Sequence, residues 1–241
     1  AIHYLIGTAN GDARRLLNAL ECAVSVTVPN PEGTILLTQS ILEAAMQKKG
    51  IVYDDKETHY DVISAFIKSI RGSDPDAALY WLAKMIYAGE DPLYIARRLI
   101  ISASEDIGNA DPRGLVVAMS AYHAVEVLGM PEGRIPLAQA TTYLASAPKS
   151  NAAYLAIEAA AEEIASGKEM QVPNRLKNAH PGGVKREDRY LYPHDFPDHF
   201  VPQEHLPEER IYYRPTDQGE EKKIAARLEQ WRAATKRHRH P

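Results

Sequence analysis

The amino-acid sequence predicts an all-α protein, in which an antiparallel helical array is followed by an irregular segment rich in proline and aromatic residues and by a C-terminal helix. Three observations predict this class. Apolar residues recur every three or four positions through most of residues 1–168, which is the period of a helix face. The pairs Asp74-Pro75, Asp91-Pro92 and Asp111-Pro112 each precede such a run. The connections between runs are short, so neighbouring helices are expected to be antiparallel.

The first region, residues 1–50, contains two helical patterns around a turn with Pro29 and Pro31. Gly11 can end the opening segment, and Asp12 can cap the next helix by accepting hydrogen bonds from its first N–H groups. A second cap is predicted at Thr38. The residues expected on the buried faces are Ala13, Leu16, Leu17, Leu20 and Val24 in the first pattern, and Ile41, Leu42, Ala45 and Met46 in the second.

In the middle region, residues 51–168, each Asp-Pro pair predicts a helix start. The Asp side chain caps the helix. Pro at the first position costs no hydrogen bond, because an N–H at that position has no partner within the helix. Pro136 is expected to open a further helix, and Ser150 to cap another that ends at Gly167. The residues expected on buried faces are Val62, Ile63, Phe66, Ile67, Ile70, Ala78, Leu79, Leu82, Ala83, Ile86, Ile95, Ala96, Leu99, Ile100, Ala103, Leu115, Met119, Tyr122 and Val125.

The third region, residues 169–241, differs in composition. Residues 173–215 hold seven of the 16 prolines, and also the aromatics Tyr190, Tyr192, Phe196, Phe200, Tyr212 and Tyr213. Disordered segments are usually poor in aromatics, so we expect an ordered extended segment whose rings pack on the helices. A final helix is predicted over residues 220–239, with Ile224, Leu228 and Trp231 on one face.

Composition excludes several classes of protein. The chain has 28 Lys and Arg against 32 Asp and Glu, which gives a net charge of −4. The chain as a whole is therefore not expected to bind polyanions strongly. The single cysteine, Cys22, excludes a disulfide framework and fits a small buried hydrophobe. There is no apolar run near the ~18 residues of a membrane span, so a cytoplasmic protein without a membrane partner is expected. Neither G-x-x-x-x-G-K-[ST] nor G-x-G-x-x-G occurs, so we expect no nucleotide cofactor here.

No catalytic or metal constellation stands out. The side chains His194, His199 and His205, with Asp195 and Asp198, lie at spacings that do not ensure convergence on one ion. Capping and packing of an irregular segment is the better interpretation, and no metal site is predicted. A small helical enzyme is the least favoured hypothesis, because no nucleophile motif or tightly spaced acid–base pair is present.

Candidate interface residues lie in the middle region. Tyr80, Trp81 and Tyr94 fit either a buried core or interface anchors, since aromatics are frequent at both. Arg98 and Glu105 are seven residues apart, hence on one helix face, and with Arg97 and Asp106 they offer salt bridges between helices or subunits. A solvated ion-pair face of little energetic weight is the alternative.

The terminal helix is locally basic, because residues 221–241 hold seven Lys and Arg against two Glu, a net +5. A basic stripe beside Trp231 would contact phosphates, whereas a solvated tail is the ordinary alternative. The candidate DNA-contact residues are Lys222, Lys223, Arg227, Arg232, Lys236 and Arg237.

Four segments carry a family resemblance. The sequence GDARRLLN at Gly11–Asn18 resembles the lid-domain motif of clamp-loader-like AAA+ ATPases. Much more specific are Lys48–Ala83, Ala96–Pro112 and the YPHDFP…VPQEHLP pattern of Tyr192–Pro207. Together they resemble the C-terminal part of the MgsA/RarA family of replication-associated recombination ATPases, which includes the Werner-helicase-interacting protein of eukaryotes.

The resemblance implies a fragment. Residues 1–50 would be the end of the AAA+ lid, residues 51–168 the helical collar through which members assemble as homotetramers, and residues 169–241 the C-terminal extension. ATP and Mg²⁺ would bind an ATPase core that precedes these residues. Arg14, at the fourth position of G-x-x-R, would be the sensor-2 arginine that reaches the γ-phosphate.

The implied role of the whole protein is ATP-dependent remodelling of single-stranded or forked DNA at stalled replication forks, with single-strand-binding protein and the replisome as partners in the nucleoid. Two hypotheses follow for these residues. The first is an oligomerisation and partner-docking part without catalysis of its own. The alternative is a helical nucleic-acid-binding module that uses the basic C-terminal helix.

Overall fold

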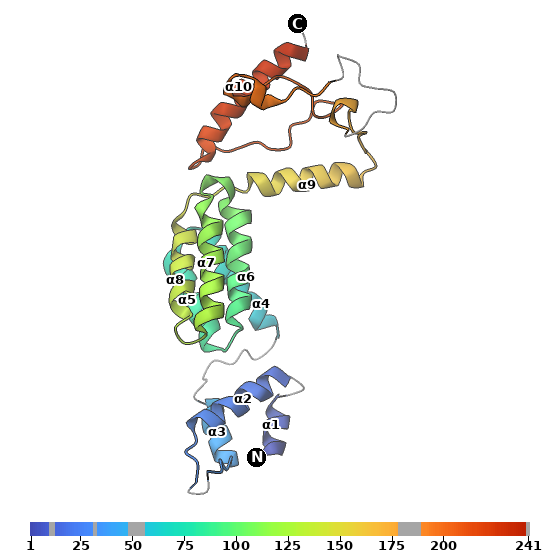
Figure 1. Cartoon of the computed structure of the whole chain (residues 1–241). Coiled ribbons are helices and arrows are strands. Elements are labelled where there is room, and N and C mark those ends of the chain that lie inside the picture. Colours follow the sequence, from blue (N-terminus) through green and yellow to red (C-terminus); the bar gives the residue numbers. More distant parts are fainter. Residues whose placement is uncertain (10–12, 31–32, 48–55, 178–188, 240–241) are drawn as a thin grey trace. The chain divides into compact units, whose positions relative to one another are not determined.

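The computed structural model describes the chain except residues 10–12, 31–32, 48–55, 178–188 and 240–241 (Figure 1). For residues 8–9, 14–15, 44–47, 56–58 and 238–239 it describes the backbone alone. Every regular element in the described ranges is helical, which confirms the all-α prediction. The chain divides into two compact units, residues 1–98 with 121–142 and residues 99–120 with 143–241.

The first unit begins with three helices: α1 (Ile2–Ala9), α2 (Ala13–Val26) and α3 (Gln39–Gln47). Helix α2 contacts both of the others. The predicted cap of α3 is confirmed, because the Thr38 hydroxyl accepts a hydrogen bond from the Ile41 N–H at 3.3 Å. The predicted stop at Gly11 and cap at Asp12 lie outside the described residues. The small core of this triplet is formed by Leu5, Ala19, Ala23 and Leu42.

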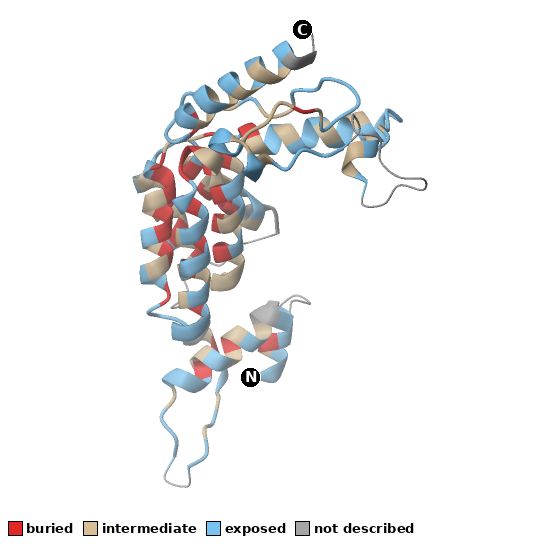
Figure 2. Cartoon of the chain, turned by 45° about the horizontal axis from the view of Figure 1, so that its top comes forward, coloured by how far each residue is buried: buried red, intermediate tan, exposed pale blue. Residues whose placement is uncertain are grey.

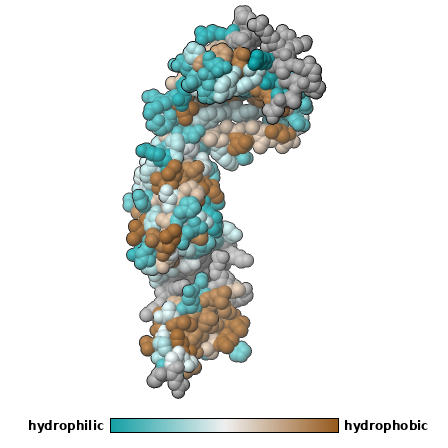
Figure 3. Space-filling model, viewed as in Figure 1, coloured by the Kyte–Doolittle hydropathy of each residue, from teal (hydrophilic) through white to brown (hydrophobic). Residues whose placement is uncertain are grey.

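The predicted buried face of α2 is partly wrong. Leu17 is 61% exposed and Val24 41% exposed, whereas Ala19 and Ala23 are buried. The apolar residues of α2 lie on more than one face of the helix. The face that packs against α1 and α3 is the one with the small residues Ala19 and Ala23. Cys22 is a free thiol at the edge of this core. Figure 3 shows apolar side chains on the outer surface of the triplet.

Helices α4 (Lys56–Arg71) and α5 (Pro75–Tyr87) pack as an antiparallel hairpin (Figure 1). The Asp74 carboxylate accepts from the Ala77 N–H at 2.9 Å, as the Asp-Pro pattern predicts. At the start of α6 (Pro92–Ser102), Asp91 likewise accepts from the Leu93 N–H at 3.0 Å. Figure 2 colours the buried positions red. In this unit they include Val62, Ile63, Phe66, Ile70, Ala78, Leu82, Met85, Ile95, Ala96, Leu137 and Ala140.

Helices α7 (Arg113–Leu128) and α8 (Arg134–Ser146) differ in detail from the prediction. Helix α8 begins two residues before Pro136, which therefore lies in its first turn. On α7 the expected core residues Leu115 and Met119 are exposed, and Ala118 is buried. Small residues face the interior because the neighbours approach closely: a Cβ added at Gly114 would lie 3.2 Å from the Leu144 side chain.

In the second unit, α6 continues into a π-helical turn (Ala103–Ile107) and a 3-10 turn (Gly108–Ala110). The N-cap residue of α9 (Ala152–Ala165) is Asn151 and not the predicted Ser150, although the Ser150 hydroxyl accepts a hydrogen bond from the Ala152 N–H at 3.2 Å. Gly167 follows its end at φ +83°, a conformation that favours glycine.

Residues 189–215, here called the strap, are extended with short turns at Pro193–Asp195 and Pro197–His199, and a further turn precedes the strap at Asn174–Leu176. Helix α10 (Glu221–Arg239) follows. The Phe200 ring stacks on Trp231 with centroids 5.3 Å apart. The prediction that strap aromatics pack is confirmed there but is wrong for Tyr190 and Tyr192, which are exposed.

Candidate interaction surfaces and their polar anchors

Tyr80 and Trp81 differ in their surroundings. Tyr80 is 62% exposed, so the core interpretation of this residue is wrong, whereas Trp81 is half-buried. The two rings meet edge to face at 5.0 Å, and the Lys84 ammonium lies 5.4 Å from the Trp81 centroid. Sequence reasoning missed Tyr87, which is 52% exposed. The signal was its position seven residues after Tyr80, on the same side of the helix.

Tyr94 belongs to a cluster inside the first unit. Its ring stacks on His59 at 5.8 Å, and the Arg97 guanidinium lies 5.9 Å from its centroid. Arg97 also pairs with Asp91 at 3.3 Å. The His59 Nδ1 lies 2.6 Å from an oxygen of Glu90, whose side chain is nearly buried. Tyr94 and Arg97 therefore join α6 to α4 and to the turn before α6.

Arg98 and Glu105 are both half-buried. The Arg98 Nε is a buried donor with no hydrogen-bond partner among the described residues. A salt bridge from these two residues to another subunit stays a prediction. Arg14, the fourth residue of the lid motif, lies near the start of α2, but its side chain is outside the described residues.

The basic residues of α10 fall into two groups. Three contact the chain itself: Lys223 pairs with Glu220 at 2.9 Å, Arg227 lies over Trp231, and Arg232 donates to the Tyr213 carbonyl at 2.7 Å. The other three are Lys222, Lys236 and Arg237, and all six side chains are exposed. Lys222 and Lys236 are fourteen residues apart, so they lie on nearly the same side of the helix.

Glu221 anchors the start of α10. Its carboxylate is fully buried and accepts hydrogen bonds from the Ser150 hydroxyl at 2.6 Å, from the Thr216 N–H and hydroxyl at 2.8 and 2.7 Å, and from the Tyr213 hydroxyl at 2.9 Å. Burial opposes ionisation, but these hydrogen bonds outweigh it and lower the pKa of Glu221. The carboxylate thus joins α10, the start of α9 and the end of the strap.

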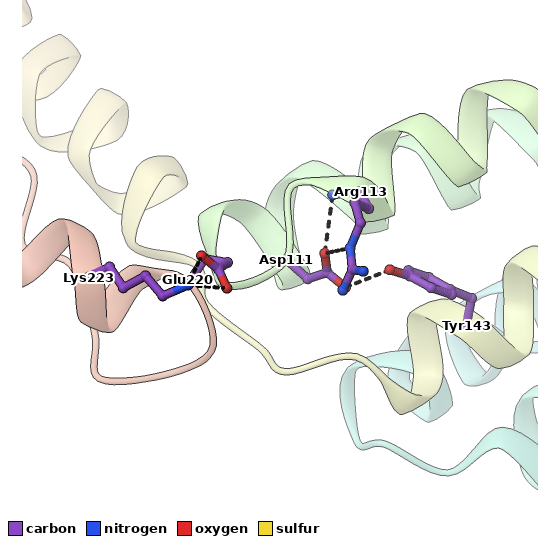
Figure 4. A network of polar contacts seen from close by, with 5 residues as sticks. All are labelled: Asp111, Arg113, Tyr143, Glu220 and Lys223. Atoms are coloured by element: carbon purple, nitrogen blue, oxygen red, sulfur yellow. Dashed lines mark hydrogen bonds and ion pairs between the residues drawn. The ribbon is translucent and has the colours of Figure 1, made fainter.

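Asp111 forms a second anchor (Figure 4). Its carboxylate accepts from the Arg113 Nε at 2.9 Å and Nη2 at 3.2 Å, and from the Tyr143 hydroxyl at 2.6 Å. The hydrogen bond from the Arg113 side chain is the main cause that lowers the pKa of Asp111, and the bond to Asp111 raises the pKa of Tyr143. Because Asp111 also accepts from the Arg113 N–H, it caps α7 as the Asp-Pro pattern predicts.

Gly219 permits the close approach of α10 to the turn before α7. Its φ is +49°, and a Cβ there would collide with the Ala110 carbonyl oxygen. The next residue, Glu220, donates its N–H to that same oxygen at 2.8 Å. Only glycine fits both the backbone conformation and the contact.

The strap is held by charged and amide side chains. Arg210 donates to Glu163 of α9 at 2.9 Å, and the Tyr212 hydroxyl donates to the same carboxylate at 2.8 Å. The Arg210 side chain is the main cause that lowers the pKa of Glu163. Gln203 accepts from the Leu191 N–H and donates to its carbonyl, which closes a loop of the strap. A cavity of about 250 Å³ lies between the strap and α10.

These polar groups suit anchoring better than catalysis. The carboxylates of Glu221 and Asp111 accept hydrogen bonds from structural donors, which lower their pKa values. The described residues contain no cluster of three or more His, Cys, Asp or Glu side chains arranged to hold a metal ion, although the His194 and His199 rings lie 4.8 Å apart. Among the helices that the structure describes, none combines the length and apolar character that crossing a membrane requires.

Two family models match this chain, and together they cover residues 1–232. Residues 1–71 match the family model described as AAA C-terminal domain, so the class is the all-α C-terminal part of AAA proteins. Residues 72–232 match the model described as MgsA AAA+ ATPase C terminal. The chain belongs to this MgsA family of AAA+ ATPases, which confirms the resemblance drawn from the sequence.

Relatives are found in bacteria and a eukaryote. The chain is 48% identical over 246 residues to an uncharacterised AAA domain-containing protein of Mycobacterium tuberculosis, covering 99% of this chain and 54% of that protein. It is 42% identical to replication-associated recombination protein A of Coxiella burnetii, covering 98% and 55%. It is 36% identical to the ATPase WRNIP1 of Dictyostelium discoideum, covering 86% and 26%. The chain spans about half the length of the two bacterial relatives named here.

Proposed function

We propose that this chain is the oligomerisation and partner-docking part of a clamp-loader-like AAA+ ATPase that acts in replication-associated recombination and repair at stalled forks. The names of the relatives support the process, and the family supports the ATPase. In the whole protein, the remaining part would bind ATP and Mg²⁺ and hydrolyse ATP in response to DNA. Single-strand-binding protein, the replisome and the nucleoid are the proposed partners and location.

The observation that carries the assembly role is the number of large apolar side chains that the collar helices expose. Assembly with identical subunits would remove such side chains from water. The exposed apolar residues of α5, α7, α8 and their connections are Tyr80, Tyr87, Leu115, Val116, Met119, Val127, Leu128, Met130 and Ile135.

A mixed-copy experiment tests this role. Cells would express the chain in two forms, one with an affinity tag and one without. If the collar assembles, the tagged form retains the untagged form through purification at micromolar concentration. Recovery of the tagged form alone, at low and at moderate salt, would contradict the proposal.

Nucleic-acid binding through α10 is the second candidate. The observation in its favour is that Lys222, Lys236 and Arg237 are exposed in a helix of local charge +5. A ring of such helices would multiply weak phosphate contacts, so the two functions are compatible.

A further inference from the structure

Helix α5 presents an uncharged aromatic stripe to solvent. Tyr80 and Tyr87 are 62% and 52% exposed. Ala83 between them is also exposed, so its predicted place on the buried face is wrong. Successive residues of a helix are rotated by about 100°, so these three residues share one side. The buried residues Ala78, Leu82 and Met85 lie on the opposite side. The two tyrosines therefore point directly away from the core.

The stripe is complementary to itself. Tyr80 precedes Ala83 by three residues, and Tyr87 follows it by four. If two copies of α5 cross antiparallel at Ala83, Tyr80 of each copy meets Tyr87 of the other on both sides of the crossing. A contact in which one patch meets an identical patch is the isologous contact of a two-fold axis. A small residue at the crossing also permits the close interaxial distances of helix pairs.

We propose that α5 binds α5 of a second copy of this chain around a two-fold axis at Ala83, with Tyr80 and Tyr87 as the anchors. The inference rests on the proposed assembly role and names its contact. Tyrosine is enriched among the residues that dominate binding energy at interfaces. Asp76, exposed at the start of the helix, lies outside the central contact, and a crossing of about 50° lets the helix ends diverge.

The charges of α5 favour a protein partner over nucleic acid. A platform for single-stranded DNA combines exposed aromatics with a positively charged groove. Helix α5 carries one acid, Asp76, and one base, Lys84, so its net charge is zero. The Lys84 ammonium lies over the Trp81 ring. Half-exposed rings without a basic groove fit a partner that offers rings of its own.

The rings alone do not fill a stable interface. A buried aromatic side chain removes roughly 150–250 Å² from water, and about half of each ring is already covered. Four rings thus supply roughly 300–500 Å², against the ~1,000 Å² that a specific interface needs. Exposed side chains of other helices must supply the rest, and Tyr60 of α4, the helix that packs against α5, is 65% exposed.

A cysteine placed at the proposed axis tests the geometry. In a chain with Cys22→Ala, the substitution Ala83→Cys puts one thiol in each copy at the crossing, where Cα atoms of about 4.4–6.8 Å separation permit a disulfide. The same residue in two copies meets itself only at a two-fold axis. We expect mild oxidation to give disulfide-linked dimers. The matched control is Ala226→Cys, at an exposed alanine of α10, which is expected to stay uncrosslinked.

Removal of the rings tests the energetics. The double variant Tyr80→Ala/Tyr87→Ala is expected to weaken self-association at least tenfold, measured by sedimentation over a concentration series. The control Tyr154→Ala removes an exposed tyrosine of α9 and is expected to leave self-association unchanged. Circular dichroism would confirm that the variants keep their helices, which is expected because the substituted side chains face solvent.

The outcomes separate this inference from the function on which it rests. Crosslinking at residue 83 together with weakened association supports both. A wild-type chain that assembles but neither crosslinks at residue 83 nor responds to loss of the tyrosines overturns the α5 contact and leaves the assembly role standing. A monomeric wild type overturns both. A chain that binds oligothymidylate through Tyr80 without self-association replaces the proposal with a nucleic-acid surface.

Discussion

Glu221 is a residue that sequence reasoning missed. In the sequence it stands beside Lys222 and Lys223, where an acid is ordinarily a solvated partner of its neighbours. Its donors come from Ser150, Tyr213 and Thr216, and the first of these is 71 residues away. No local pattern predicts that a distant serine and a strap tyrosine converge on one carboxylate. Asp111 was predictable as a cap because its partner is local, but its bond to Tyr143 was not.

Replacement of Glu221 by glutamine is expected to lower the free energy of unfolding by about 2 kcal/mol, because the amide NH₂ cannot accept the hydrogen bonds that a carboxylate oxygen accepts. Urea unfolding followed by circular dichroism measures the change. Glu229→Gln, at an exposed acid of the same helix, is the matched control and is expected to have little effect. Equal losses in the two variants would contradict the anchoring role.

Stability is also expected to depend on pH through the two anchors. The folded-state pKa values of Glu221 and Asp111 lie below the ordinary values of 4.5 and 3.8. Their stabilising contribution is therefore complete above those ordinary values and is lost as the pH falls through the lowered folded-state values. The melting temperature, measured from pH 7 to pH 3, is expected to fall with the pH. In Glu221→Gln this fall should be smaller than in the wild type. An equal fall in both would contradict the contribution of Glu221.

Arg14→Ala, made in a full-length family member, is expected to lower ATP turnover. The reason is that a sensor-2 arginine would stabilise the charge on the γ-phosphate. The control is Arg15→Ala, at the neighbouring arginine of the same helix turn. Steady-state hydrolysis at saturating DNA is the measurement, and turnover equal to the wild type would reject the assignment of Arg14.

At the scale of elements, helix starts were more predictable than helix faces. The Asp-Pro pattern placed the starts of α5 and α6, because a cap depends on residues adjacent in sequence. The buried face of α7 was predicted only in part, since Val125 is buried as expected. Its periodic Leu115 and Met119 are exposed, and glycine and alanine pack inward because the neighbouring helices approach closely. Periodicity shows that a face is apolar but not which partner covers it.

Helix α10 gives a prediction about DNA. The triple variant Lys222→Gln/Lys236→Gln/Arg237→Gln is expected to lose most affinity for single-stranded DNA and to reduce its salt dependence, because each phosphate contact releases a counterion. Fluorescence anisotropy at several salt concentrations measures both effects. The control removes three exposed charges elsewhere, at Arg134, Lys177 and Arg189. Equal binding by the two triple variants would end the idea of an α10 contact.

At the scale of the molecule, the sequence predicted the class and the structure adds the surfaces. Family motifs such as Lys48–Ala83 predicted a collar, but exposure of Tyr80 and Tyr87 appears only when the helix faces are known. A tetramer built from two-fold contacts needs two kinds of contact. The stripe on α5 would supply one, and the exposed apolar side of α7 is a candidate for the other.

The mass of the chain in solution tests the central claim most directly. Light scattering at two concentrations and two salt levels would suffice. Assembly through the collar predicts a mass near four times 26.8 kDa, and a fall to two copies or one in the Tyr80→Ala/Tyr87→Ala variant. A mass of 26.8 kDa under every condition would contradict the claim that these residues hold the assembly interface.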